Sequence, residues 1–247
     1  MSTPNPAMAR RILSLLDLTS LNDTDDAAAV RKLCALAVSA AGRVAAVCIW
    51  PRFIPAARSA LLGTGVPVAV VANFPAGSDD IGSVAAETAA DVADGADEVD
   101  VVFPYRAFLA GDVDTGVALV RRCREACGSR VVLKVILETG QLGLAENIRR
   151  AADMAVAGGA QFLKTSTGKT QPGATPQAVA VLLDVIAEAR ARGRSVGLKV
   201  SGGIRTVAEA SALLQQYELR FGPQSATPAT FRIGASTLVT ELLAWTA

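Results

Sequence analysis

The sequence contains no histidine among its 247 residues. This absence excludes catalytic triads and dyads in which histidine is the base, and it excludes zinc sites built on imidazole ligands. Any acid–base chemistry in this protein therefore depends on Asp, Glu, Lys or Tyr side chains, or on bound water.

Aromatic residues and excess charge are also scarce. Phe, Trp and Tyr make up 4% of the chain, and the formal net charge is +1. No nucleic-acid partner is expected, because such proteins use basic patches and stacking aromatics. Four cysteines are too few for a disulfide framework in a chain of this length. Cys123 and Cys127, one helical turn apart, are expected to be reduced thiols packed in the core.

Long apolar runs are missing as well. Residues 1–10 lack the apolar stretch of a signal peptide, and no run reaches the length of a membrane span. We therefore expect a cytoplasmic protein with no membrane partner. The chain is nevertheless 51% apolar, which is enough to bury a sizeable core.

What the sequence does contain is a regular alternation of short apolar strands and amphipathic helices. Thr175-Pro176 and the capping box from Thr206 to Glu209 mark two helix starts, and a helix opened by Asp25 and Asp26 is expected to close near Gly42. The strands recur about every thirty residues, the size of a βαβ unit. They are expected at 15–18, 44–49, 68–71, 98–102, 131–137, 162–165, 195–200 and 230–234.

Eight such units in one chain predict an α/β protein with a single-domain (β/α)8 TIM barrel. The domain is expected to span 1–247, with a short segment, 1–13, ahead of the first strand. The alternative is an open doubly wound sheet. It is less favoured because no Gly-x-Gly-x-x-Gly pattern follows the first strand.

Charged residues interrupt five of the expected strands. Functional groups of such barrels lie at the carboxyl ends of the strands, and side chains alternate between the two faces of a strand. Inward-pointing charges would therefore gather at one barrel mouth, and a purely structural ion network is the less favoured explanation of them. These residues are Asp17, Asp100, Lys134, Lys164 and Lys199.

Lys164 and Lys199 lie at the ends of adjacent expected strands. Two neighbouring ammonium groups repel, so one of them loses its proton more readily and becomes a nucleophile. A free amine can form a Schiff base with a carbonyl substrate, and Asp100 could then move protons. Taken alone, Lys164 could equally be a lysine that extends from a strand end into water.

Glycine turns follow the last three strands. Backbone N–H groups in such turns can approach an anion closely, and the loops after strands seven and eight commonly bind phosphate in these barrels. Tight turns alone would also explain each glycine singly. The candidate phosphate-binding residues are Gly168, Lys169, Gly202, Gly203, Gly234, Ser236 and Thr237.

With these motifs assembled, the chain resembles the deoxyribose-phosphate aldolases, which are class I aldolases with a (β/α)8 barrel. The most specific match is the Lys-Thr-Ser-Thr-Gly run at 164–168. The matching segments are 16–19, 47–53, 73–75, 98–106, 134–140, 162–168, 199–205 and 234–236.

The resemblance implies reversible cleavage of 2-deoxy-D-ribose 5-phosphate to D-glyceraldehyde 3-phosphate and acetaldehyde, in deoxyribose phosphate catabolism. It assigns the Schiff base to Lys164, the tuning of that amine to Lys199 and proton transfer to Asp100. It implies no metal and no organic cofactor. The substrate pocket it implies contains Asp17, Thr19, Cys48, Lys134 and Thr165, with Cys48 expected to be a packed thiol.

Some features depart from the family pattern. Thr237 stands where a second serine is frequent, and the chain stops without the tyrosine that ends some relatives. A phosphosugar-binding barrel without activity and a transaldolase-like enzyme with a larger donor remain alternatives. An exposed apolar helix face would allow a homodimer, but the sequence does not locate one.

Overall fold

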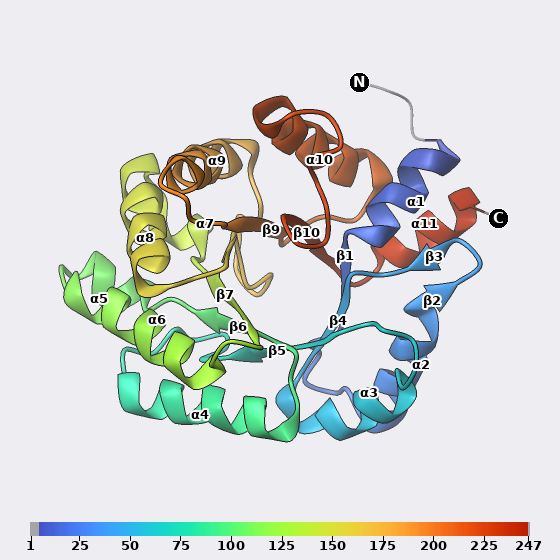
Figure 1. Cartoon of the computed structure of the whole chain (residues 1–247), viewed down its shortest axis with the longest axis horizontal. Helices are drawn as coiled ribbons and strands as arrows, with labels where there is room; N and C mark the ends of the chain where they lie inside the picture. The colour runs from blue at the N-terminus through green and yellow to red at the C-terminus, as the bar shows by residue number, and fades with distance from the viewer. Residues whose placement is uncertain (1–4, 247) are drawn as a thin grey trace.

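A computed structural model of the chain describes residues 5–246. Eight of the strands in that part of the chain close into a parallel barrel, confirming the predicted fold (Figure 1). Closure is made by β1, which pairs with β10 through Asp17 and Gly234 and with β4 through Asp17 and Ala46. The barrel strands are β1 (Leu16–Thr19), β4 (Ala46–Ile49), β5 (Val68–Ala72), β6 (Glu98–Val102), β7 (Val132–Ile136), β8 (Phe162–Lys164), β9 (Gly197–Ser201) and β10 (Phe231–Ala235).

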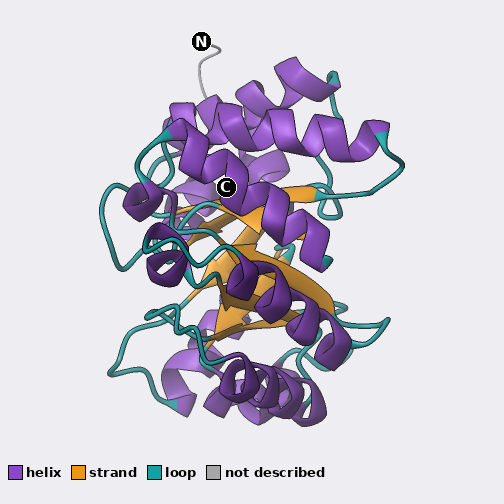
Figure 2. Cartoon of the chain, turned by 90° about the vertical axis from the view of Figure 1, so that its left-hand side faces the viewer, coloured by secondary structure: helices purple, strands orange, loops and turns teal. Residues whose placement is uncertain are grey.

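Helices surround the barrel and cover its outer face (Figures 1 and 2). The predicted starts are confirmed at Thr175, which caps α9, and at Thr206 and Glu209, which form a capping box on α10. The helices are α1 (Pro6–Ser14), α2 (Ala27–Leu36), a 3-10 turn (Pro51–Phe53), α3 (Ile54–Ala60), α4 (Ile81–Asp94), α5 (Tyr105–Leu109), α6 (Asp114–Cys127), α7 (Thr139–Leu142), α8 (Ala145–Gly158), α9 (Pro176–Ala191), α10 (Val207–Phe221) and α11 (Leu238–Thr246).

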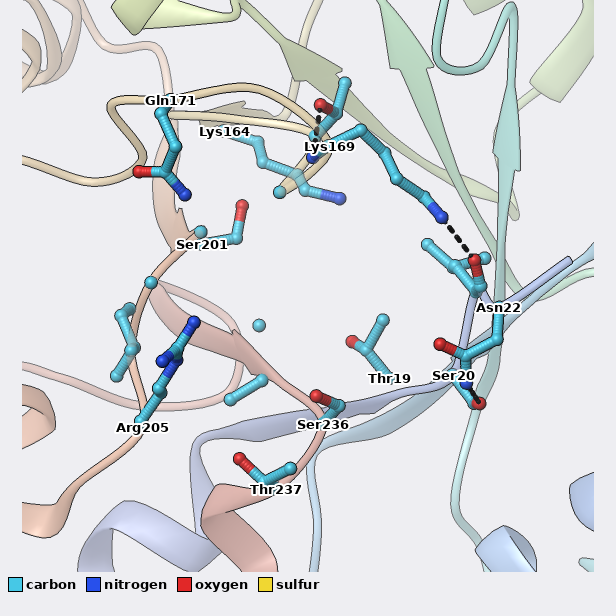
Figure 3. A pocket seen from close by; sticks show the side chains of 18 residues that line it. Thr19, Ser20, Asn22, Lys164, Lys169, Gln171, Ser201, Arg205, Ser236 and Thr237 are labelled. Atoms are coloured by element: carbon cyan, nitrogen blue, oxygen red, sulfur yellow. Dashed lines mark hydrogen bonds between the residues drawn. The ribbon is translucent and has the colours of Figure 1, made fainter.

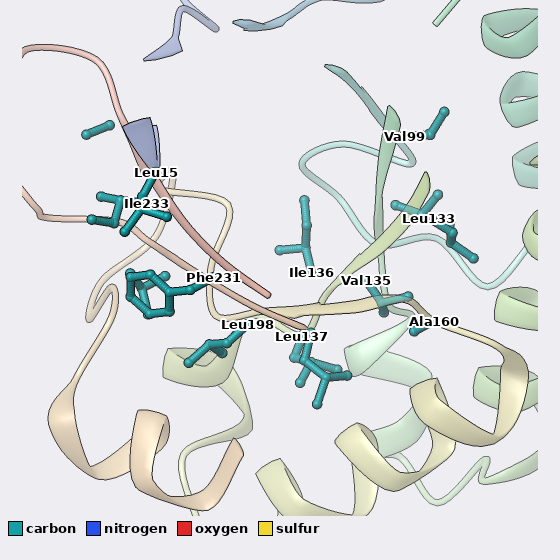
Figure 4. Packing of buried hydrophobic residues seen from close by; sticks show 14 of the residues in the cluster. Leu15, Val99, Leu133, Val135, Ile136, Leu137, Ala160, Leu198, Phe231 and Ile233 are labelled. Atoms are coloured by element: carbon teal, nitrogen blue, oxygen red, sulfur yellow. The ribbon is translucent and has the colours of Figure 1, made fainter. Parts of the chain in front are cut away.

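The main core lies between the strands and the helical shell. Val99 and Leu133, on the neighbouring strands β6 and β7, are fully buried there, as are Leu198, Phe231 and Ile233 on β9 and β10 (Figure 4). The charged residues of the same strands occupy the alternate positions, which face the barrel interior. Strand periodicity thus separates an apolar outer layer from a polar interior.

Two segments add to the sequence-based expectation or differ from it. The part of the leading segment that is described, from residue 5 on, forms α1, capped by Asn5, and packs beside α11 (Figure 1). The helix after Asp26 ends at Leu36 instead of near Gly42. A hairpin of β2 (Val38–Ser39) and β3 (Gly42–Arg43) follows, and Gly42 has a φ of 125°, which a glycine adopts without strain.

Within residues 5–246, no helix is long and apolar enough to cross a membrane. The four cysteines are buried free thiols, as expected for packed cysteines.

Candidate active site

Lys164, Lys199 and Asp100 meet inside the barrel. The Nζ atoms of both lysines donate to Oδ2 of Asp100, each at 2.8 Å. Strand pairing explains the meeting, because Lys164 is in register with Lys199 on the neighbouring strand. Lys134, in register with Asp100, donates to its Oδ1 at 2.7 Å.

Asp17 joins the same cluster from β1. Its Oδ2 lies 2.6 Å from the Nζ atom of Lys199, and its Oδ1 accepts a 2.6 Å hydrogen bond from Nη1 of Arg232. The five charged residues predicted from their strand positions are therefore brought together. All five are buried, with Lys164 the least enclosed at 3% exposure.

The sequence analysis missed two members of this cluster, Glu98 and Arg232. Nη2 of Arg232 donates to Oε1 of Glu98 at 2.7 Å, and Nζ of Lys134 lies 2.5 Å from Oε2 of Glu98. A signal for both was present. Arg232 follows Phe231 in an apolar strand, and Glu98 precedes Asp100 by two positions, on the same strand face.

The electrostatics single out Lys164 among the lysines. Burial lowers the pKa of Lys164; the carboxylate of Asp100 acts in the opposite direction, and the charge of Lys199 adds to the lowering. Burial also acts to lower the pKa of Lys199, but Asp100 and Asp17 outweigh it and hold that pKa well above its usual value. Lys164 is thus the amine best suited to act as a nucleophile.

The pKa values of Asp100 and Asp17 are shifted down. Burial alone would raise the pKa of Asp100, but the cations of Lys134, Lys164 and Lys199 hold it well below its usual value. Lys199 and Arg232 lower the pKa of Asp17 in the same way, against the effect of its burial. Both groups are therefore carboxylates at neutral pH.

A cavity of about 550 Å³ is bordered by Lys164 (Figure 3). All of the residues predicted to bind phosphate line it, and so does Thr19. Its lining also includes residues that the sequence analysis did not single out. These are Ser20, Leu21, Asn22, Thr167, Gln171, Ser201, Ile204, Arg205 and Ala235.

Four residues predicted for the substrate pocket do not line this cavity. Asp17 and Lys134 lie in the buried ionic cluster. The hydroxyl of Thr165 bonds to the backbone N–H and carbonyl of Ser201, each at 3.0 Å. Cys48 is fully buried in a small apolar cluster with Val71, and burial raises the pKa of its thiol. Cys48 is therefore a packed thiol, as expected.

The loop after β8 is fixed in place by Glu138. The buried carboxylate of Glu138 accepts from the Thr167 hydroxyl at 2.5 Å and from the Thr167 backbone N–H at 3.2 Å. The Thr167 hydroxyl in turn accepts from the backbone N–H of Lys169 at 3.0 Å. Lys169 then reaches across the cavity mouth, where its Nζ atom donates to the carbonyl of Leu21 at 2.7 Å.

Close backbone approach explains two of the glycines. A Cβ atom at Gly202 would lie 2.9 Å from Cα of Gly173, so the two loops touch only because both positions lack side chains. Gly202 also has a φ of 92°. The pair brings the loops after β8 and β9 together at the cavity wall.

Taken together, the cavity combines an amine of lowered pKa with a carboxylate that can move protons and a rim of backbone N–H groups, hydroxyls and a lysine. Such a site can bind an anionic group at one end and capture a carbonyl carbon at the other. Among residues 5–246, no cluster of three or more acidic or cysteine side chains has the arrangement of a metal site.

Comparison with known proteins finds a family of aldolases. The model of the DeoC/LacD family of aldolases matches residues 11–234. A candidate deoxyribose-phosphate aldolase from Toxoplasma gondii has a similar structure, with a TM-score of 0.88 and 28% identity over 98% of this chain and 94% of that one. The deoxyribose phosphate aldolase of Aeropyrum pernix, a tetramer, gives a TM-score of 0.77 and 25% identity over 97% of this chain and 92% of that one.

The family match covers most of the chain, and the structural matches cover nearly all of it. The chain therefore belongs to the DeoC/LacD family of aldolases, and it is a lyase that breaks and forms carbon–carbon bonds.

Proposed function

We propose that the protein is a class I aldolase that reversibly cleaves 2-deoxy-D-ribose 5-phosphate to D-glyceraldehyde 3-phosphate and acetaldehyde. The observation that carries this proposal is Lys164, an amine of lowered pKa that borders the cavity and contacts Asp100 at 2.8 Å. The structural relatives described as deoxyribose-phosphate aldolases support the choice of substrate. The reaction belongs in deoxyribose phosphate catabolism in the cytoplasm.

The first steps build the Schiff base. The lone pair of the Lys164 Nζ atom attacks C1 of the open-chain aldehyde, and the carbonyl oxygen takes up a proton to give a carbinolamine. Loss of water then leaves an iminium ion. Asp100 lies at the Nζ atom and can move these protons, directly or through a water molecule.

Cleavage then uses the iminium as an electron sink. The C3 hydroxyl loses its proton, its oxygen forms the new carbonyl of glyceraldehyde 3-phosphate, and the electrons of the C2–C3 bond move to give an enamine on Lys164. Protonation of the enamine at C2 and hydrolysis release acetaldehyde and restore the free amine. No atom or electron is required from a cofactor.

The opposite end of the cavity suits the phosphate. Gly202, Gly203 and Gly234 can offer backbone N–H groups, Ser236 precedes the first turn of α11, and Lys169 supplies a cation. Gly234 lies within β10, and the other groups come from the loops after β8, β9 and β10. Holding the phosphate there would orient the aldehyde end of the substrate toward Lys164.

Reductive trapping tests the proposal. The protein is incubated with acetaldehyde, reduced with borohydride, digested and mapped by mass spectrometry. An ethyl group is expected on Lys164, with much less on Lys199, which is held protonated, and none at position 164 in Lys164→Arg. Absence of the adduct on Lys164 would contradict the mechanism. Dihydroxyacetone is run in parallel, and a preference for it would indicate a transaldolase-like donor instead.

A further inference from the structure

Arg232 and Glu98 lie beneath the proposed catalytic residues and take no direct part in the reaction. Arg232 bridges two carboxylates: its Nη1 donates to Asp17 at 2.6 Å and its Nη2 donates to Glu98 at 2.7 Å. Glu98 also lies 2.5 Å from the Nζ atom of Lys134. The two residues therefore extend the ionic cluster across the barrel, away from the cavity.

The negative and positive charges of this cluster are equal in number when the Lys164 amine is not counted. Its carboxylates are Asp17, Glu98 and Asp100. The lysines and arginine that do not border the cavity, Lys134, Lys199 and Arg232, supply an equal number of cations. Lys164 is the remaining basic group. A protonated Lys164 would give the buried cluster a net positive charge, whereas a free amine leaves it neutral.

The charge balance matters because the cluster is buried. The side chains of the cluster are at most 6% exposed, so water screens their charges poorly. An uncompensated charge in such surroundings is costly, and a titratable member of the cluster loses or gains a proton to avoid it. Lys164 is the member next to the cavity, where a proton can leave to solvent.

We propose that Arg232 and Glu98 are positioning residues that complete a charge-neutral cluster beneath Lys164, and that this neutrality keeps the Lys164 amine free of its proton. The inference rests on the proposed Schiff-base function. It extends the control of Lys164 from its neighbour Lys199 to the far side of the barrel interior.

The guanidinium is held firmly enough for this role. Its Nε donates to the carbonyl of Pro228, and its Cζ atom lies 5.7 Å from the ring centre of Phe162. Gly197 leaves room for that ring, because a Cβ there would lie 2.4 Å from it. Burial acts to lower the pKa of Arg232, but Asp17 and Glu98 raise it, so its charge is permanent.

The other titratable groups near Lys164 do not change the net charge of the cluster. The Cys48 thiol on β4 is buried and uncharged, since burial raises its pKa. Glu138 and Lys169, in the loops above, are engaged with Thr167 and with the carbonyl of Leu21. Arg205 lines the outer part of the cavity. None of these forms an ion pair with the cluster.

Carbamoylation by cyanate measures the free amine without depending on turnover. Cyanate reacts with neutral amines, so the rate at Lys164, followed by peptide mass spectrometry from pH 5 to 10, gives the midpoint of its ionisation. The variants are Arg232→Met, Glu98→Gln, the double variant carrying both changes, and Arg232→Lys, which retains the charge. Circular dichroism checks that each one folds.

Arg232→Met and Glu98→Gln are expected to shift the ionisation midpoint of Lys164 in opposite directions. Arg232→Met leaves an unbalanced carboxylate, so the midpoint should rise by about one pH unit, and the rate at pH values below the wild-type midpoint should fall about tenfold. Glu98→Gln should lower the midpoint, while the double variant and Arg232→Lys should restore it. Unchanged midpoints, or shifts of both single variants in the same direction, would overturn the proposal.

Two complications are covered by this design. If Arg232→Met does not fold, Glu98→Gln and the double variant still decide the sign of the effect. If wild-type Lys164 reacts with cyanate at neutral pH but forms no adduct with acetaldehyde, the proposed aldolase reaction is wrong while the charge balance stands. If Lys164 forms the acetaldehyde adduct but the variants do not shift its cyanate midpoint, the aldolase reaction stands and the proposed charge balance is wrong.

Discussion

At the residue scale, Gly234 makes room for Lys199. A Cβ atom at position 234 would lie 3.1 Å from Cε of Lys199 and 3.0 Å from Cβ of Ser201. Both distances are shorter than ordinary van der Waals contact. The glycine was predicted to bind phosphate, and it does line the cavity, but the packing adds a separate reason for a residue without a side chain.

Gly234→Ala is therefore expected to displace the stem of Lys199 and to lower kcat/KM for the aldol reaction about tenfold or more, because small misplacements of catalytic groups are costly. Steady-state kinetics checks this. The control is Gly82→Ala in α4, where the nearest atom is 3.6 Å from the added Cβ. That change should leave activity as it is and slightly stabilise the helix. Equal activities in the two variants would contradict the expectation.

The charged residues show what strand periodicity can predict. Asp100, Lys134 and Lys199 interrupt apolar strands, and alternation of faces was enough to bring them together. Arg232 interrupts a strand in the same way and was overlooked, although the same rule applies to it. The partners of each charge could not be predicted, since Asp100 bonds three lysines through a register that depends on barrel closure.

At the element scale, the loop after β8 depends on a contact from the loop after β7. Glu138 has a φ of 55°, a left-handed conformation that is strained for a residue with a side chain, and its carboxylate holds Thr167. This arrangement fixes the backbone that leads from Lys164 to Lys169. Sequence patterns gave the two loops but not the contact between them.

Thr167→Val should loosen this loop and raise KM for the phosphorylated substrate about tenfold, because it removes a hydrogen bond to a charged group. The rate of acetaldehyde trapping at Lys164 should change little, since the amine lies on the strand. Thr167→Ser retains the hydroxyl and serves as the matched control. A fall in trapping as large as the rise in KM would show instead that the contact positions Lys164.

Helix α4 contains a buried acid outside the active site. Burial raises the pKa of Asp91 to about 7, and the neighbouring charges of Glu87 and Asp94 add to the rise. The native state therefore keeps a proton that the unfolded chain releases near pH 4. Since the unfolded chain binds fewer protons between about pH 4 and 7, the stability of the fold decreases as pH rises through this window.

Asp91→Asn should remove that dependence. The gain in unfolding free energy should be near zero at pH 4 and should reach its maximum above pH 7, where about 4 kcal/mol is the upper bound. Urea denaturation at pH 4 and pH 8 measures it. Asp94→Asn, at an exposed position of the same helix, should have a much smaller effect. A gain of equal size at both pH values would point to packing instead of ionisation.

The elements that the sequence analysis missed are short or lie at the edge of the repeat. Helix α1 precedes the first strand, so no βα repeat predicts it. Its signals were the Asn5 cap, Pro6 and the helical spacing of Ala9, Ile12 and Leu13. The hairpin of β2 and β3 contains two residues in each strand, too few for a periodic pattern. Neither element touches the cavity, which explains why the site could be predicted without them.

At the scale of the whole molecule, the barrel could be predicted from the number of βα units. Parallel strands that are joined through helices have few arrangements in which both faces of the sheet are buried. Oligomeric state did not follow in the same way. Exposed apolar side chains such as Leu36, Leu62, Leu144 and Leu219 lie on separate helices and loops, and the predicted homodimer stays a prediction.

Barrel closure makes every strand depend on its neighbours, so the molecule is expected to unfold as one unit. Trp50, after β4, and Trp245, in α11, provide two probes; Trp245→Phe leaves the first and Trp50→Phe the second. Ile12→Ala, in α1, removes a fully buried side chain and should cost about 3 kcal/mol. When Ile12→Ala is combined with either tryptophan variant, the urea concentration at the midpoint of unfolding, followed by fluorescence, should fall by the same amount in both. Separate transitions would mean that α1 and α11 unfold independently of the strands that hold the active site.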